Sequence, residues 1–104
     1  MIRINVIREN KNIKKITFKG HANYDEYGKD IVCAAVSATY LCTVNAILCF
    51  KEDSIDVISN KDLLKLIVLK KDNITISLLE NMINCLESLQ EQYPKNINLD
   101  KEEK

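Results

Sequence analysis

The first part of the chain alternates between hydrophobic and polar positions, as β-strands do. Residues 2–7 alternate between aliphatic side chains and polar or charged ones, which predicts a half-buried strand. A polar turn at 9–12 follows, and a second strand that carries Ile16 and Phe18 ends at Gly20. Because the connection is short, the two strands are expected to form an antiparallel hairpin.

The next regular stretch is apolar on almost every side. Residues 31–50 are rich in Ala, Leu, Val and Cys with almost no charge, and Asp30 before them is a favourable helix N-cap. A helix that is apolar nearly all round is typically buried on most sides. We therefore expect this helix to lie against the sheet and against a partner subunit.

The second half of the chain repeats the pattern of two strands and a helix. Residues 54–58 and 63–69 are predicted strands, and the latter is apolar on both faces, as in a central or covered strand. A helix then begins near Thr75 or Ser77 and ends at Gln92, ahead of a proline. Its two hydrophobic stripes are expected to cover the sheet and to contact the other helix or a second subunit; they are Ile76, Leu79, Ile83 and Leu86, and Leu78, Met82, Cys85 and Leu89.

The order ββαββα, with an optional edge strand around Ile97 and Leu99, predicts the fold class α/β (α+β). The expected architecture is a two-layer sandwich with a mostly antiparallel sheet and two helices. Residues 1–99 are expected to form a single domain, and the charged tail 100–104 is expected to be frayed.

Charge and hydropathy narrow the functional classes. The 104 residues contain 15 Lys and Arg against 15 Asp and Glu, which argues against direct nucleic-acid binding because that needs a basic surface. No apolar run is expected to reach the roughly 18 residues of a membrane span, and the N-terminus does not resemble a signal peptide. The protein is therefore expected in the cytoplasm, where thiols stay reduced.

The four cysteines lack the CxxC spacing of zinc ribbons and of thioredoxin-like pairs. In a helix, Cys33 and Cys42 would point to opposite sides, whereas Cys42 and Cys49 would share a face. These thiols cannot converge on one metal, so neither a metal nor a cofactor is expected. We interpret Cys42, Cys49 and Cys85 as small buried hydrophobic residues.

The rarest residue types of the chain lie close together. The only histidine, His21, lies between the two glycines, Gly20 and Gly28. With Asp30 as N-cap, Cys33 lies in the first turn of the helix, where backbone N–H groups and the helix dipole favour a thiolate. The same N–H groups are expected to stabilise an oxyanion when the sulfur attacks a carbonyl.

The loop that follows His21 would let its ring return to Cys33. A histidine within hydrogen-bond reach can hold the thiolate and later protonate a leaving amine. Gly20 would permit a close approach of backbone or substrate, and Gly28 would let the loop open and close. Ser37, one turn after Cys33, would bond the Cys33 carbonyl or contact substrate.

Each of these residues also has a structural interpretation, as a surface histidine, a packed cysteine and a helix cap. Two tyrosines of the loop, Tyr24 and Tyr27, either pack down on the sheet or form a lid or a substrate-contacting surface. No third residue that would orient His21 is evident in the sequence.

The residues GHA at 20–22, Gly28 and DIVCAAVS at 30–37 together resemble the signature of the bacterial ribosomal-processing cysteine protease family. The match has no gaps, and the resemblance extends from the leading hairpin to the end of the last helix. It implies an endopeptidase with a Cys–His dyad, in which Cys33 is the nucleophile and His21 the base. Asp30 and Ser37 occupy motif positions with supporting roles.

The same resemblance implies a substrate and an assembly. The substrate would be the N-terminal extension of a large-subunit ribosomal protein, with bulky hydrophobic and aromatic residues ahead of the cut and a small residue after it. The assembly would be a homodimer. The alternative function is a non-catalytic dimeric module that binds the ribosome or a ribosomal protein and does not need the thiol. Redox sensing is a weaker alternative, because no resolving cysteine lies near Cys33 in the sequence.

Overall fold

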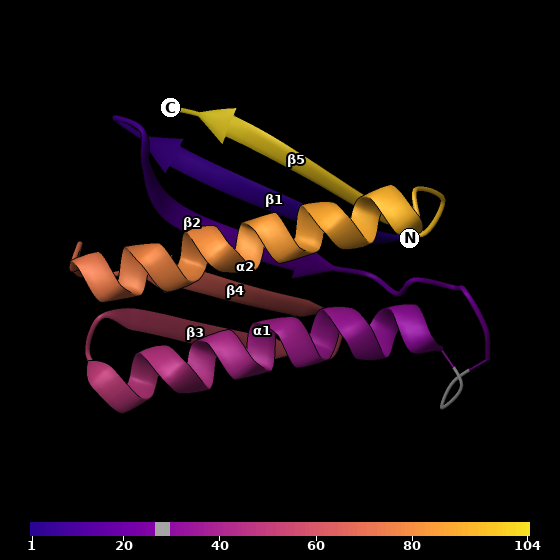
Figure 1. The fold of residues 1–104 in the computed structure, drawn as a ribbon, viewed down its shortest axis with the longest axis horizontal. Helices are drawn as coiled ribbons and strands as arrows, with labels where there is room; N and C mark the ends of the chain where they lie inside the picture. Colours follow the sequence, from indigo (N-terminus) through magenta and orange to yellow (C-terminus); the bar gives the residue numbers. More distant parts are fainter. Residues whose placement is uncertain (27–29) are drawn as a thin grey trace.

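The computed structural model describes residues 1–26 and 30–104 (Figure 1). A five-stranded sheet has the order β3-β4-β2-β1-β5, and two helices lie side by side over one face of it. Three strand pairs are antiparallel, and β5 is parallel to β1. The predicted two-layer sandwich is confirmed; its elements are β1 (Ile2–Glu9), β2 (Asn12–Lys19), α1 (Ile31–Phe50), β3 (Ile55–Asn60), β4 (Leu63–Val68), α2 (Asn73–Gln92) and β5 (Ile97–Glu103).

The leading hairpin forms as predicted. Glu9 pairs with Asn12, so the turn between β1 and β2 contains two residues, Asn10 with φ 52° and Lys11 with φ 68°. Positive φ at both positions is the type I′ geometry, whose twist matches that of a hairpin. The inward side of the two strands enters the core through Ile2, Ile4, Val6, Ile13, Ile16 and Phe18.

The position of β4 brings distant segments together at one end of the sheet. β4 lies in the sheet interior between β3 and β2, as its apolar sequence predicts. The last residue of β2, Lys19, pairs with Leu63, the first residue of β4. The end of β2 therefore lies beside the turn at residues 61–62, which joins β3 to β4.

The second helix begins earlier than predicted. Asp72 caps α2 by accepting a hydrogen bond from the Thr75 N–H at 2.9 Å, so the helix starts at Asn73. Its end at Gln92 agrees with the prediction. Leu79, Ile83 and Leu86 of the first stripe are buried. In the second stripe Met82 is buried and Leu78 and Leu89 pack against the core, whereas Cys85 is exposed.

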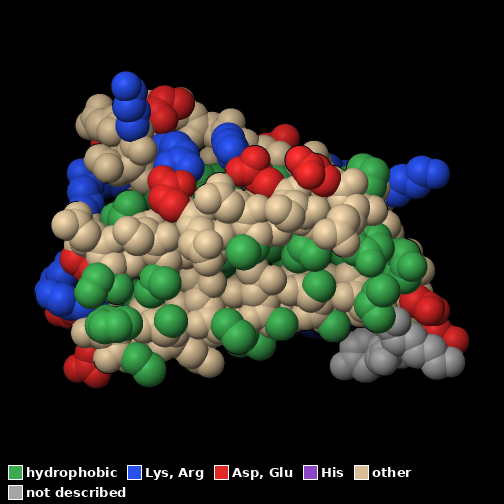
Figure 2. Space-filling model, viewed as in Figure 1, with side chains coloured by type: hydrophobic (Ala, Val, Ile, Leu, Met, Phe, Trp, Pro, Cys, Tyr) green, Lys and Arg blue, Asp and Glu red, His purple; other side chains and the backbone are tan. Residues whose placement is uncertain are grey.

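Within this chain the first helix, by contrast, is covered on one side only, and the partner subunit expected on its other side stays a prediction. Its buried residues are Val32, Val36, Val44 and Ile47, whereas Leu41 is 52% and Phe50 65% exposed. Figure 2 shows hydrophobic side chains gathered along this uncovered side of α1. The cause is the layer structure, because α1 contacts the sheet below it and α2 on only one flank.

Three cysteines also differ from their interpretation as buried residues. Cys42 and Cys49 lie on the uncovered side of α1, and Cys85 is exposed on α2. Hydrophobic character was a poor guide here because the side of α1 and the side of α2 that carry these thiols are not covered by other parts of the chain.

The composition of α1 corrects a second expectation. The helix is long and apolar enough to cross a membrane, with a mean hydropathy of 1.9, so the prediction that no apolar run approaches that length was wrong. Core helices of globular proteins can have the same composition. Here the helix lies along the sheet, and four of its residues belong to the core.

The C-terminal tail is not frayed. β5 continues to Glu103 and pairs with β1, including Asn5 with Asp100 and Arg8 with Glu103. The Lys104 N–H also donates to the Arg8 carbonyl oxygen at 2.8 Å. The predicted boundary at residue 99 therefore falls inside a strand. The backbone of β1 forms hydrogen bonds with the backbone of the polar residues that follow.

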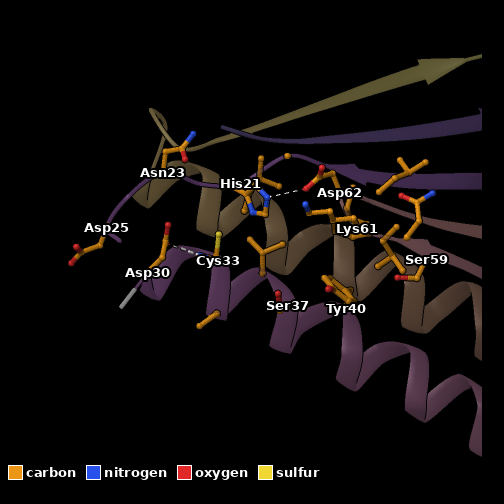
Figure 3. A pocket seen from close by; sticks show the side chains of 18 residues that line it. His21, Asn23, Asp25, Asp30, Cys33, Ser37, Tyr40, Ser59, Lys61 and Asp62 are labelled. Carbon is orange, nitrogen blue, oxygen red and sulfur yellow. Dashed lines mark hydrogen bonds and ion pairs between the residues drawn. The ribbon is translucent and has the colours of Figure 1, made fainter. Parts of the chain in front are cut away.

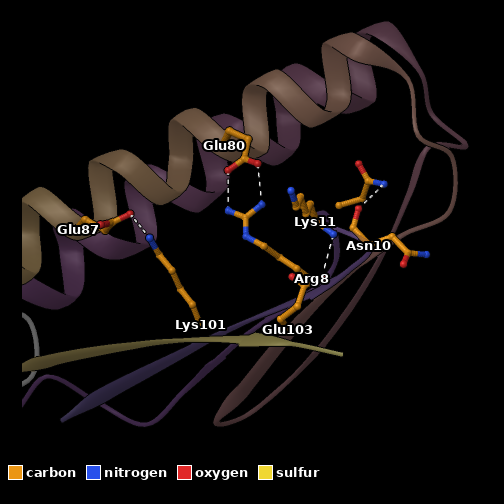
Figure 4. A network of polar contacts seen from close by, with 8 residues as sticks. Arg8, Asn10, Lys11, Glu80, Glu87, Lys101 and Glu103 are labelled. Carbon is orange, nitrogen blue, oxygen red and sulfur yellow. Dashed lines mark hydrogen bonds and ion pairs between the residues drawn. The ribbon is translucent and has the colours of Figure 1, made fainter.

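Charged side chains of β1 and β5 form ion pairs with α2 (Figure 4). Arg8 on β1 forms two hydrogen bonds with Glu80, at 2.7 and 2.8 Å, and Lys101 on β5 forms an ion pair with Glu87 at 2.9 Å. The hydrogen bond from Arg8 lowers the pKa of Glu80 below its usual value. One charge of the tail, that of Lys101, therefore pairs with α2.

Candidate active site

Cys33 lies in the first turn of α1, and the capping geometry agrees with the prediction. One oxygen of Asp30 accepts the backbone N–H groups of Val32 and Cys33, each at 3.0 Å. The Cys33 sulfur accepts a hydrogen bond from the Ala22 N–H, with 3.2 Å between nitrogen and Sγ. A backbone donor is therefore directed at the sulfur.

The hydrogen bonds of Asp30 differ from the expectation that free backbone N–H groups stabilise an oxyanion here. Its carboxylate already holds the N–H groups of Val32 and Cys33, so that part of the prediction was wrong for these two donors. The second carboxylate oxygen accepts the Tyr24 N–H at 3.0 Å. Desolvation raises the pKa of Asp30, but backbone donors, led by Cys33 and Tyr24, lower it to a net value below the usual one. Asp30 therefore stays charged and keeps its donors at neutral pH.

The backbone conformation of Gly20 sets the position of His21, the next residue. The φ of Gly20 is +89°, and a Cβ at this position would lie 2.7 Å from the Met1 carbonyl oxygen. The Gly20 N–H donates to the Asp62 carbonyl at 3.3 Å. Any other residue here would strain the backbone and collide with Met1, so the close approach predicted for Gly20 is one between backbone segments.

His21, the next residue, contacts the turn between β3 and β4. Its Nε2 lies 3.0 Å from Oδ1 of Asp62. The side chain of His21 is 65% exposed and that of Asp62 57% exposed. Sequence reasoning missed this partner, because the two residues are 41 positions apart in the chain and give no local signal.

The structure brings His21 and Cys33 to one cavity without a hydrogen bond between them (Figure 3). The cavity has a volume of about 690 Å³ and is lined by residues of α1, the end of β2 and the β3–β4 turn. In Figure 3 the His21 ring lies between the side chains of Cys33 and Asp62. Among residues 1–26 and 30–104, no hydrogen bond joins the ring to the thiol, and no cluster of metal-binding side chains is present.

One wall of this cavity is apolar. Phe18 of β2 and Tyr40 of α1 pack with ring centroids 5.1 Å apart, and Leu64 of β4 lines the same wall. Ser37 lines the cavity as well, but no described residue bonds its hydroxyl. The bond to the Cys33 carbonyl, one of its two predicted roles, is therefore absent from the described contacts.

Contacts from several elements hold the loop at residues 21–26. The buried Ala22 donates to Cys33, and its carbonyl accepts a hydrogen bond from the Asn96 side chain at 2.9 Å. The Tyr24 ring meets Tyr93 edge-on at 5.5 Å, so it packs at the end of α2 and not on the sheet. The expectations for Tyr27 and Gly28 lie outside the described residues.

Comparison with known proteins finds relatives along the whole chain. A model of the family "Cysteine protease Prp" matches residues 1–98. The ribosomal processing cysteine protease Prp of Staphylococcus aureus is 28% identical over 104 residues, which cover 95% of this chain and 97% of that protein.

Solved structures agree with this match. The crystal structure of an essential ribosomal processing protease Prp from S. aureus with a covalently linked product peptide has a TM-score of 0.94 and 26% identity, covering 98% of this chain and all of that one. The S. aureus Prp structure with a substrate peptide has a TM-score of 0.87 and 25% identity, with the same coverage of both chains. The chain therefore belongs to the cysteine protease Prp family and is a cysteine protease.

Proposed function

We propose that this protein removes the N-terminal extension of a large-subunit ribosomal protein, with Cys33 as nucleophile and His21 as base. The observation that carries the proposal is that a thiol at a helix N-terminus and the only histidine line one cavity. The S. aureus relatives are named as ribosomal processing proteases, and one was solved with a substrate peptide. These names support the same class of substrate for this chain.

In the proposed reaction, His21 takes the proton of the Cys33 thiol, and the thiolate attacks the carbonyl carbon of the scissile peptide bond. A C–S bond forms while the carbonyl electron pair moves to oxygen. Collapse of this intermediate breaks the C–N bond, and the leaving amine takes the proton from His21. Water then attacks the thioester, which releases the carboxylic acid and restores the thiol.

The unliganded geometry is compatible with this cycle if substrate completes the dyad. Catalytic hydrogen bonds are often absent or long before substrate binds, and both side chains face the same cavity. The apolar wall of Phe18, Tyr40 and Leu64 suits the bulky hydrophobic or aromatic residue expected ahead of the cut. Ser37 lines the cavity and can contact the peptide. The backbone of Gly20 positions His21, and the carboxylate of Asp30 caps the helix turn that carries Cys33.

The test uses a synthetic peptide that spans the extension and the start of that ribosomal protein from the same organism. Wild-type protein is expected to cut it once, before a small residue, and mass spectrometry of the products locates the cut. A peptide with the residues around the junction scrambled serves as the control. Binding of the native peptide by a well-folded protein without any cleavage would instead support the non-catalytic binding module.

We also propose that the working form is a homodimer in the cytoplasm. The support is the uncovered side of α1, which places Leu41 and other apolar side chains in solvent along a 20-residue helix. A helix of this length extends for about 30 Å, enough to contribute to an isologous interface. None of the four cysteines is paired in a disulfide, which suits a cytoplasmic protein.

Substituting Leu41→Glu is expected to produce monomers, because it places a charge in the proposed interface. Light scattering of wild-type and variant protein measures the change. Ile74→Glu is the matched control, since Ile74 is a similarly exposed aliphatic residue on α2, with 44% exposure. A wild-type protein that is monomeric at micromolar concentration would contradict the proposal.

A further inference from the structure

We infer that Asp62 is a positioning residue for His21, which holds Nε2 so that the other ring nitrogen, Nδ1, is presented to Cys33. The inference rests on the proposed function, because it deepens the role given to His21. The contact that supports it is the 3.0 Å distance between His21 Nε2 and Asp62 Oδ1.

The backbone fixes the relative position of these two side chains. Lys19 pairs with Leu63, and the Gly20 N–H donates to the Asp62 carbonyl at 3.3 Å. The residues immediately beside His21 and Asp62 are therefore bound to each other by the sheet and its extension. The side-chain torsions of the two residues remain to be set, and the 3.0 Å contact restrains them.

The chemistry of imidazole gives this contact a consequence. A carboxylate can only accept a hydrogen bond, so a neutral His21 that contacts Asp62 carries its proton on Nε2. Nδ1 then has the free electron pair that can take the Cys33 proton. Because the two nitrogens lie on different sides of the ring, holding Nε2 on Asp62 turns Nδ1 away from Asp62. In Figure 3 the thiol lies on the far side of the ring from Asp62.

The competing explanation is an ordinary surface ion pair. Such pairs contribute at most about 1 kcal/mol to stability, and the exposure of both side chains, 65% and 57%, fits that class. Stability alone therefore cannot separate the two explanations. What separates them is whether removal of the carboxylate changes the rate of the chemical step or the tautomer of the ring.

The first experiment is kinetic and compares Asp62→Ala and Asp62→Asn with wild type on the extension peptide. Alanine keeps the backbone contact to Gly20 but removes the acceptor, so kcat is expected to fall about 10- to 100-fold while KM changes less than about threefold. Asparagine keeps an oxygen acceptor and is expected to retain more of kcat than alanine. The matched control is Asp56→Asn, an exposed aspartate on β3 that does not line the cavity.

An unchanged kcat in Asp62→Ala overturns the inference. So does an Asp62→Asn variant no faster than Asp62→Ala, because the hydrogen bond would then not explain the loss. A rise in KM at constant kcat would assign Asp62 to substrate binding and would also overturn it. An equal loss in Asp56→Asn would mean that the strand pair, and not the contact to His21, is responsible.

The second experiment does not depend on cleavage. The chain has a single histidine, so ¹⁵N NMR of histidine-labelled protein reports on His21 alone. At about pH 9, where an imidazole is neutral, the wild-type ring is expected to be almost entirely the Nε2-protonated tautomer, and Asp62→Ala is expected to show a tautomer mixture. Identical spectra would overturn the positioning role even if the protease proposal held. A lack of cleavage by wild type together with the expected spectra would instead reject the proposed function and keep the contact.

Discussion

Cys33→Ala is expected to leave no measurable cleavage of the extension peptide, a loss of at least about 10³-fold. The Cys33 sulfur is the only atom of the site able to form the covalent thioester. Alanine removes it and does not disfavour the helix, because alanine has a higher helix propensity than cysteine. The hydrogen bond from Ala22 to Sγ is also lost, but the helix cap at Asp30 uses backbone donors and remains. Cleavage is measured by mass spectrometry of the products, and folding by circular dichroism.

Cys42→Ala is the matched control for this variant. Cys42 is an exposed cysteine on the same helix, and it lies outside the cavity, so its loss is expected to leave cleavage unchanged. The control matters because Cys42, Cys49 and Cys85 are exposed on the single chain, so a thiol reagent is not selective for Cys33. Inhibition by such reagents therefore cannot identify the nucleophile, whereas substitution can. Cleavage that survives Cys33→Ala would mean a different nucleophile or a contaminating protease.

His21→Ala is expected to reduce kcat about 10²- to 10⁴-fold, the usual contribution of a general base. The side chain is mostly exposed and makes no described packing contact that stability requires, so the variant is expected to fold like wild type. Single-turnover cleavage measured beside an unfolding curve separates the chemical effect from any structural one.

Chemical rescue provides the control for His21→Ala. Added imidazole can enter the open cavity and replace the missing ring, so it is expected to restore part of the cleavage by this variant. It is not expected to restore cleavage by Cys33→Ala, where the nucleophile itself is absent. A His21→Ala variant with wild-type kcat would contradict the assignment of His21 as the base.

Much of the candidate site could be predicted from the sequence because it is built from local rules. Asp30 caps a helix through donors two and three residues ahead of it, which is a relation that the sequence displays directly. The position of Cys33 in the first turn follows from that cap. The need for Gly20 could also be anticipated, although its cause is the carbonyl of Met1, the residue that precedes β1.

The partners of these residues could not be predicted, because they depend on strand order. Asp62 meets His21 only because β4 pairs with β2, and nothing local in a turn of Asn, Lys and Asp indicates that pairing. Asn96 reaches the Ala22 carbonyl because β5 starts beside the start of β1. The mistaken role for the N–H groups of Val32 and Cys33 has a similar origin, since a capping carboxylate and an oxyanion compete for the same donors.

The sequence by itself determined the elements, their order and the inward face of most strands, because periodicity, caps and turn residues act over a few neighbouring positions. It also determined which thiol and which base are candidates for catalysis. Tertiary structure decided how exposed α1 is, that residues 100–103 join the sheet, and which carboxylate contacts His21. These features depend on which surfaces meet across the fold, and contacts between residues far apart in the chain leave no periodic trace in the sequence.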